Sequence, residues 1–333
     1  MKIIIPILIL LRLSVTGYSQ IIKGTVMDQN THTGVNFASV YFSGTFEGTH
    51  TDQKGYFELD ISRHNSMPLT ISALGYYSII LSKVPNNKPC LIYLTPKVYE
   101  LSEVVITAKT STLKRRANLN IFKREFLGST LNGMECYISN EDDILFTYNA
   151  KSDTLKAFSP NPITIYNKAL GYKIIYYLDK FEYCRSKNYG LITGNYLFSE
   201  DTTSLNNQQA KFERKRKSAF LGSRMHFFRA LWENNLDQTG FVVKDSANVK
   251  LTSDKFVTQK DSLNESNPSK YIRYRGTLFV GYHSVLPQSQ IKMIGDYVYF
   301  EENGFFDPMG IGWQGEMAKQ RIGDLLPFEY KLK

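Results

Sequence analysis

The stretch GTVMDQNTHTGVNFASVYFSGTFEGTHTDQKGYFEL, residues 24–59, decides how the first part of this chain folds. Apolar and polar residues alternate within it, so that Ala38, Val40 and Phe42 share one face of a predicted strand. Such alternation over short runs is typical of half-buried β-strands, and clusters of Gly, Asp and Thr between the runs predict turns. The pattern extends over residues 21–95 and predicts about seven short strands, as in a β-sandwich.

Spaced positions in residues 21–109 resemble the carboxypeptidase-regulatory-like (transthyretin-like) domain family. The shared pattern is Gly-x-Val, an Ala-x-Val strand, a Gly-Thr loop, Thr-Asp-x-x-Gly-x-Phe and then Ser-x-x-Gly-Tyr. It is carried by Gly24, Val26, Ala38, Val40, Gly44, Thr45, Gly48, Thr51, Asp52, Gly55, Phe57, Ser72, Gly75 and Tyr76. The resemblance implies an all-β, transthyretin-like or prealbumin-like sandwich over residues 20–97. It also implies a folding, spacing or adhesive module that performs no chemistry.

The N-terminus has the pattern of a secretory signal peptide over residues 1–19. Lys2 is followed by an apolar run at residues 3–11, and Gly17 and Ser19 are small residues before a cut at Gln20. A buried N-terminal strand is the alternative interpretation. The segment at residues 93–109, YLTPKVYELSEVVITAK, resembles the exit segment of this domain in Bacteroidota envelope proteins. Both features predict export to the periplasm, the outer membrane or the cell surface, and no later run predicts a transmembrane helix in the mature chain.

The remaining residues predict a linker at 98–112 and an uncharacterised α+β domain with a mainly antiparallel sheet at 113–333. Helical spacing predicts helices at 112–129 and 206–235 and a short helix at 316–325. Aromatic and β-branched runs predict strands at 144–148, 154–158, 163–166, 171–184, 189–200, 241–243, 271–282 and 291–301.

The formal net charge of +9 is concentrated in two basic runs, at residues 114–116 and 211–217. Export argues against nucleic acid as a partner, so solvated helix faces are expected, with an acidic glycan or a lipid head group as the alternative. Of the three cysteines, Cys136 and Cys184 are the best candidates for a disulfide if one forms. Small buried side chains, with Cys90 among them, are the favoured interpretation.

Motif searches predict no catalytic, cofactor-binding or metal-binding residue. None of the five His residues stands in HxxE, HExxH or HxH, which argues against a zinc carboxypeptidase. Ser223 and His226 are at i, i+3 on a predicted helix, but a packed helix face is the favoured interpretation. Glu301, Glu302 and Asp307 could form a carboxylate pair for glycoside chemistry, but solvated acids are the favoured interpretation. Trp232 and Trp313 could stack on a sugar, but core residues are the favoured interpretation. Asp28, Asp52 and Asp60 lack the spacing of a calcium loop and predict turns or caps.

These features favour a non-catalytic exported envelope protein. Its sandwich would act as a spacer or anchor that presents a domain binding an envelope protein or glycan. One alternative is a hydrolase of unfamiliar type in residues 113–333, and another is a truncated relative of the TonB-dependent receptors.

Overall fold

The protein is described here from a computed structural model that covers residues 20–64, 66–82, 89–97, 112–201, 208–260, 269–284, 286 and 288–332. The predicted signal peptide at 1–19 and nearly all of the predicted linker at 98–112 lie outside these residues. None of the helices in the described ranges is both long and apolar enough to cross a membrane.

The N-terminal residues form a β-sandwich of two sheets, as the alternating pattern predicts. One sheet has the order β4-β1-β7 and the other β3-β2-β5-β6. The strands are β1 (Ile21–Asp28), β2 (Ser39–Phe42), β3 (Gly48–His50), β4 (Tyr56–Asp60), β5 (Leu69–Ser72), β6 (Ile79–Leu81) and β7 (Cys90–Leu94). All pairs are antiparallel except β1 with β7. Fully buried Val26, Val40 and Leu69 belong to the core between the sheets, which confirms the all-β prediction for this part.

A larger antiparallel sheet of six strands follows, and its long strands β12 and β13 pair along their whole length. The strands are β8 (Cys136–Ile138), β9 (Leu145–Asn149), β10 (Thr154–Phe158), β11 (Ile163–Asn167), β12 (Tyr172–Cys184) and β13 (Tyr189–Glu200). Helix α1 (Thr112–Leu127) packs Phe122 and Phe126 against this sheet. The helix, predicted at 112–129, ends before Gly128, whose φ of 101° suits glycine.

A second, separate set of strands forms two small sheets with the orders β14-β17-β18-β20 and β15-β16-β19. The strands are β14 (Phe241–Lys244), β15 (Val257–Lys260), β16 (Ser269–Ile272), β17 (Thr277–Tyr282), β18 (Ser289–Met293), β19 (Val298–Phe300) and β20 (Ile311–Gly315). The prediction of unbroken strands at 271–282 and 291–301 is wrong, because both are interrupted at the same level, at residues 273–276 and 294–297. Each interrupted strand therefore contributes to both small sheets.

The predicted single helix at 206–235 is also wrong. The structure has α3 (Gln209–Phe220) and α4 (Arg224–Trp232), separated by a turn. In that turn Gly222 has a φ of 76°, and a Cβ there would lie 2.7 Å from the Tyr282 ring. Ser223 then caps α4 by accepting a hydrogen bond from the His226 backbone N–H. The break lets the two apolar faces of this segment pack against different cores.

Residues 112–332 are organised around two hydrophobic cores, although they were predicted as one α+β domain. The first core lies under the six-stranded sheet and includes α1 and Phe220 at the end of α3. The second includes Phe227 and Phe228 of α4 together with strands of the small sheets. The chain then passes through α5 (Glu316–Lys319) and the 3-10 helix η5 (Ile322–Asp324), within the predicted helix at 316–325, and returns to the first core. The short helix α2 (Leu131–Met134) contacts η5.

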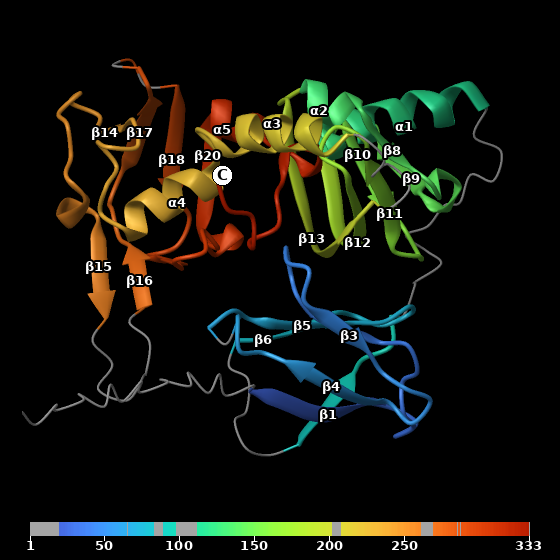
Figure 1. Ribbon diagram of the computed structural model, residues 1–333. Helices are drawn as coiled ribbons and strands as arrows, with labels where there is room; N and C mark the ends of the chain where they lie inside the picture. Colours follow the sequence, from blue (N-terminus) through green and yellow to red (C-terminus); the bar gives the residue numbers. More distant parts are fainter. Residues whose placement is uncertain are drawn as a thin grey trace, which may run out of the picture.

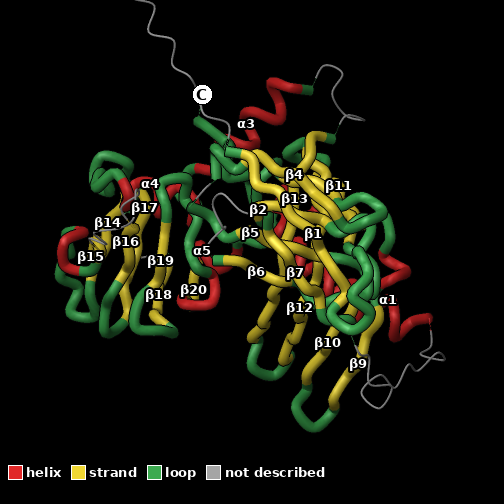
Figure 2. Tube along the Cα trace, turned by 90° about the horizontal axis from the view of Figure 1, so that it is seen from below, coloured by secondary structure: helices red, strands yellow, loops and turns green. Residues whose placement is uncertain are grey.

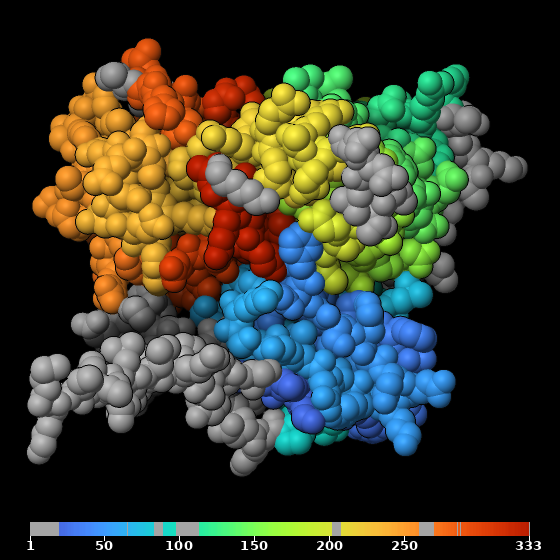
Figure 3. Space-filling model, viewed as in Figure 1, coloured from blue at the N-terminus to red at the C-terminus, as the bar shows by residue number. Residues whose placement is uncertain are grey.

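The sandwich lies below the other two parts in Figure 1, with the six-stranded sheet and the small sheets side by side above it. Figure 2, the view from below, shows the same separation between β14–β20 and β8–β13. In the space-filling view of Figure 3 the blue sandwich meets both the green-yellow part and the red C-terminal segment. The predicted fold class, a sandwich followed by a mainly antiparallel α+β region, is confirmed.

Candidate functional site

The loop between β2 and β3 joins the sandwich to the rest of the molecule. The Gly44 N–H donates to the Tyr196 carbonyl at 2.7 Å, and the Phe198 N–H donates to the Thr45 carbonyl at 2.9 Å. The loop thus adds backbone hydrogen bonds to the outer edge of β13. The Gly44 carbonyl also accepts from the Phe328 N–H at 2.9 Å. The blue loop in Figure 1 rises from the sandwich to this position.

A group of ionisable side chains lies where the sandwich contacts the C-terminal segment. His64 Nε2 lies 3.1 Å from Glu329 Oε1, and that oxygen also accepts from the Phe46 N–H at 2.9 Å. Glu47 completes the group, with one donor atom of each of the three residues within 4.8 Å of the others. Ser66 donates to the buried Glu301 at 2.7 Å, a further link between the sandwich and the small sheets. None of these residues was predicted as a site.

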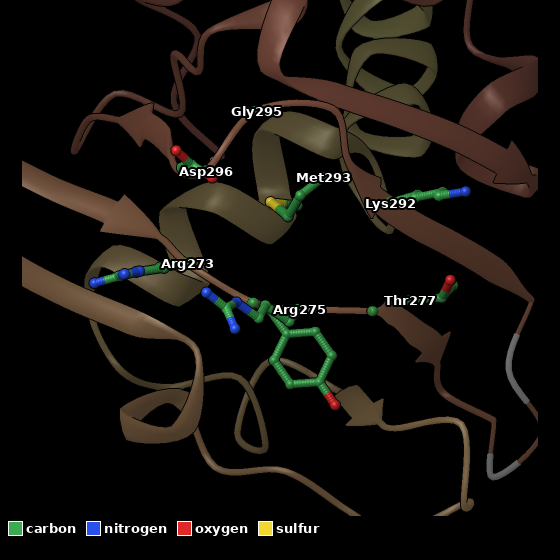
Figure 4. Close-up of a pocket in the computed structure, with 9 residues that line it drawn as sticks. Arg273, Arg275, Thr277, Lys292, Met293, Gly295 and Asp296 are labelled. Atoms are coloured by element: carbon green, nitrogen blue, oxygen red, sulfur yellow. The ribbon is translucent and has the colours of Figure 1, made fainter.

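A hollow opens in the surface where the two strand pairs are interrupted. It has a volume of about 480 Å³, and its walls are residues 273–277 on one side and Lys292, Met293, Gly295 and Asp296 on the other. Figure 4 shows Arg275 at the centre, with Arg273 and Asp296 to one side and Lys292 and Thr277 to the other. We call this hollow the basic cavity.

The basic cavity has an excess of positive charge that the surrounding residues leave uncompensated. Arg273, Arg275 and Lys292 are all exposed, and within the described ranges none of them forms an ion pair. Asp296 is the single acidic residue of the lining. Guanidinium groups with free donors are suited to bind carboxylate or phosphate oxygens.

In each of the two basic runs singled out in the sequence one arginine contributes to packing, whereas Lys114, Arg116, Lys211, Arg214 and Lys217 are exposed, as expected. Arg115 donates to the Ile144 carbonyl at 2.8 Å. Arg216 is 4% exposed, lies over the Tyr172 ring at 4.0 Å and pairs with Glu200 and Glu213. The expectation of a solvated helix face is therefore wrong for Arg216, which is buried because aromatic stacking and two carboxylates compensate its charge.

Ser223 and His226 do not form a nucleophile and base pair. The Ser223 hydroxyl oxygen accepts the His226 N–H, and His226 Nδ1 accepts the Gly222 N–H at 3.1 Å. The His226 ring packs against Phe220, Phe241 and Tyr282. Burial, together with smaller contributions from the charges of Arg229 and His283, lowers the pKa of His226 to about 4, so the ring is neutral at pH 7. The favoured interpretation, a packed helix face, is confirmed.

The acidic groups considered for glycoside chemistry have separate local partners. Glu301 is buried rather than solvated and accepts hydrogen bonds from Tyr299 and Ser66, while burial raises its pKa. Asp307 accepts from the Met309 N–H at the start of a short 3-10 helix, η4 (Pro308–Gly310). Glu302 is exposed. The expectation of solvated acids is thus wrong for Glu301, because the sandwich covers it.

The three aspartates of the sandwich act in turns, as predicted. Asp28 accepts from the backbone N–H groups of Asn30 and Thr31, Asp52 from those of Lys54 and Tyr56, and Asp60 from that of Ser62. Each of these backbone partners lies within four residues in the chain, and Asp28 also accepts from the Tyr76 hydroxyl at 2.8 Å. The side-chain-to-backbone bonds are those that Asp forms in turns.

All three cysteines are free. Cys136 lies opposite Asn167, which pairs with Tyr172 at the start of β12, whereas Cys184 is at the other end of that strand. At ~3.3 Å per residue, the length of β12 places them about 40 Å apart, so the pairing considered in the sequence does not form. Cys90 is buried, as expected, and the other two are half-buried.

The two tryptophans are half-buried against the second core, as the interpretation of core burial predicts. Each also has a cation over its ring, Lys270 over Trp232 at 4.7 Å and Arg224 over Trp313 at 5.7 Å. Their faces are therefore engaged within the protein.

Sequence reasoning missed the basic cavity because Arg273 and Arg275 stand in a segment whose apolar alternation predicts one continuous strand. The one local signal is Gly276, whose φ of 133° interrupts the strand just before β17. An isolated glycine within a strand pattern marks a bulge or a break, and Gly295 stands in the opposite interruption.

Comparison with known protein families identifies the first domain. Residues 22–106 match the model of the CarboxypepD_reg-like domain, so the N-terminal sandwich is a CarboxypepD_reg-like domain. The match covers about a quarter of the chain. The search of curated proteins returns no match to the chain.

Proposed function

We propose that this chain is an exported, non-catalytic protein of the cell envelope, in which the sandwich anchors a C-terminal region that binds an anionic glycan. The proposal of export and an envelope location rests on the signal-peptide pattern at residues 1–19 and on the exit segment of the sandwich. It includes the periplasm or the outer membrane as the site of action.

The basic cavity is the observation that carries the binding role. Its volume of about 480 Å³ is within the range of ligand sites. Three exposed cations and one carboxylate line it, so an anionic group gains more than a neutral one there. Tyr274 lines the cavity, and Tyr297, beside Asp296, is 62% exposed. Tyrosine rings offer faces on which a sugar ring can pack.

The non-catalytic part of the proposal is supported by the groups considered for catalysis. Ser223 and His226 are engaged in helix capping and core packing, and Glu301 and Asp307 have their own partners. The lining of the basic cavity combines Arg, Lys, Asp, Tyr and Thr, with Asp296 as its one carboxylate. Such a set binds and orients an anion, whereas glycoside hydrolysis uses a pair of carboxyl groups.

The test is a binding titration with two sugar oligomers of equal length, a galacturonic acid oligomer and a neutral galactose oligomer. We expect the wild type to bind the acidic oligomer alone, with an affinity that falls as salt rises. Arg275→Gln, the central cation, should weaken binding about tenfold or more, since a charge-assisted bond is lost. Lys151→Gln, in an exposed turn, is the matched control and should leave the affinity unchanged.

Equal binding of both oligomers, or an unchanged affinity in Arg275→Gln, would contradict the assignment of the cavity. Binding to anionic lipid vesicles without binding to the acidic oligomer would replace the glycan with a lipid head group. The envelope location is checked separately: mass spectrometry of protein from fractionated cells should find a mature N-terminus at Gln20.

A further inference from the structure

A second cluster, far from the basic cavity, combines side chains from the sandwich and from the C-terminal segment. Glu47 and His64 come from the sandwich, and Glu329 comes from the last residues of the chain. One donor atom of each lies within 4.8 Å of the other two. A spacing of this kind is invisible in the sequence, because Glu329 is 265 residues from His64.

Two atoms of the cluster are buried and lack any hydrogen-bond partner. They are Nδ1 of His64, whose side chain is 5% exposed, and Oε2 of Glu329. A neutral imidazole has one donor and one acceptor nitrogen, and a protonated one has two donors. With Nε2 facing Glu329, either form leaves Nδ1 unsatisfied. An orphaned buried polar atom costs about 1–3 kcal/mol and therefore points to a missing partner.

The chemistry of the donors indicates what the missing partner of Glu329 Oε2 is. An imidazole nitrogen together with carboxylate oxygens is a ligand set for Zn²⁺ or a similar first-row divalent cation. A tetrahedral Zn²⁺ with bonds of about 2.1 Å holds its ligands roughly 3.4 Å apart. His64 faces the cluster through Nε2, and Glu329 has a free oxygen, Oε2, for the same cation.

The charges around the cluster fit a cation. Glu47 and Glu329 contribute two carboxylates, and Arg63, which pairs with Glu47 at 3.2 Å, has a side chain that is 76% exposed and free to turn away. The remaining polar contact is the Phe46 N–H on Glu329 Oε1, which leaves Oε2 as the free acceptor. The Phe42 ring packs beside His64 at 5.3 Å and shields it from water.

We propose that Glu47, His64 and Glu329 bind one divalent cation of the zinc type, which fastens the C-terminal segment to the sandwich. Three protein ligands leave a fourth position for water. The site is structural: it links the loop after β2 and the turn after β4 to the last residues of the chain. It is independent of the basic cavity and of the glycan proposal.

The experiment is isothermal titration of the chelator-treated full chain with Zn²⁺, accompanied by thermal unfolding with and without the metal. We expect one Zn²⁺ per chain and a higher Tm in its presence, because a ligand that binds only the folded state stabilises it. Ca²⁺ and Mg²⁺, which prefer all-oxygen sites, should bind far more weakly. Hydrogen exchange of the Phe46 and Phe328 amides should slow when Zn²⁺ is added.

Three substitutions locate the site. His64→Gln and Glu329→Gln should each lower the Zn²⁺ affinity 100-fold or more. Glu47→Gln, whose side chain is half-buried, should lower it about tenfold and leave the metal-free fold intact by circular dichroism. Glu58→Gln, on the surface of β4, is the matched control and should bind as the wild type does.

The absence of stoichiometric Zn²⁺ binding by the wild type would overturn the proposal. So would unchanged binding in folded Glu47→Gln and Glu329→Gln, since the metal would then lie elsewhere. Loss of Zn²⁺ binding in these variants while glycan binding is retained would keep the two proposals separate.

Discussion

The acidic residues of the sandwich and those of the C-terminal region are stabilised in opposite ways. Asp28, in the sandwich, accepts the backbone N–H groups of Thr31 and Asn30 and the Tyr76 hydroxyl, and these bonds lower its pKa. Glu301 and Asp324, in the C-terminal region, have distant partners, such as Ser66 and Thr130, and burial raises their pKa. Hydrogen-bond donors thus favour the charged form of Asp28, whereas burial disfavours the charged forms of Glu301 and Asp324.

This difference shows where long-range structure acts in the molecule. A turn aspartate needs nothing beyond its own segment, so it reports only that a turn is present. An acid whose partner is some 200 residues away reports a contact between segments that are distant in the chain. The polar groups with distant partners are therefore the ones that hold the parts of this chain in position.

The largest expected effect is a loss of folding stability at acid pH that depends on His226. Because the folded-state pKa of His226 is about 4 and the unfolded value is 6.5, the unfolded chain binds more protons between these values. The stability contribution of His226 is present above pH 6.5 and is lost as pH falls toward 4, by about 3 kcal/mol at most. Urea unfolding of the wild type and His226→Phe at pH 7 and pH 4.5 measures it.

His226→Phe keeps an aromatic ring among Phe220, Phe241 and Tyr282, and it removes the titration. We expect it to be less stable than the wild type at pH 7, since the Gly222 N–H loses its acceptor, and to show a smaller loss at pH 4.5. His50→Gln, on the exposed strand β3, is the control and should follow the wild type. Equal losses in all three proteins would refute the role given to His226.

An intermediate effect is expected from Asp324→Ala. The Asp324 carboxylate accepts hydrogen bonds from the side chains of Thr130 and Asn132, at 2.9–3.1 Å, and links η5 to α2. Without it two partly buried donors lose their acceptor, which should cost about 2 kcal/mol. Asp142→Ala, at a fully exposed acid of the same region, is the control. The denaturant midpoints of both variants measure these effects. An unchanged stability of Asp324→Ala would contradict the distinction between acids with distant partners and the other acids.

The smallest effect should come from Asp52→Ala in the sandwich. It removes two hydrogen bonds to the exposed turn at Lys54 and Tyr56, for a loss of about 1 kcal/mol or less. Asp52→Asn keeps the side-chain oxygen and should be close to the wild type. Amide exchange should rise in the turn alone, and a change that reached β13 or the C-terminal segment would show that local acids of the sandwich also have long-range roles.

The predicted and observed structures differ where local patterns lack information. Alternation in residues 271–282 and 291–301 predicts strands correctly, but nothing in it requires that both be interrupted at the same level. Likewise the two apolar faces at residues 206–235 predict helix, but whether they bury against one core or two depends on the rest of the chain. Gly222 and Gly276 were the available signals for the breaks, and each has a positive φ.

The sequence by itself determined the sandwich, its family and its turn aspartates, because alternation and turn chemistry act over a few residues. It also determined the helix α1 and the strands β9 and β10. Only the tertiary structure decided the division of the C-terminal region into two cores, the basic cavity and the cluster of Glu47, His64 and Glu329. These features arise from contacts between segments distant in the chain, and residue spacing does not encode such contacts.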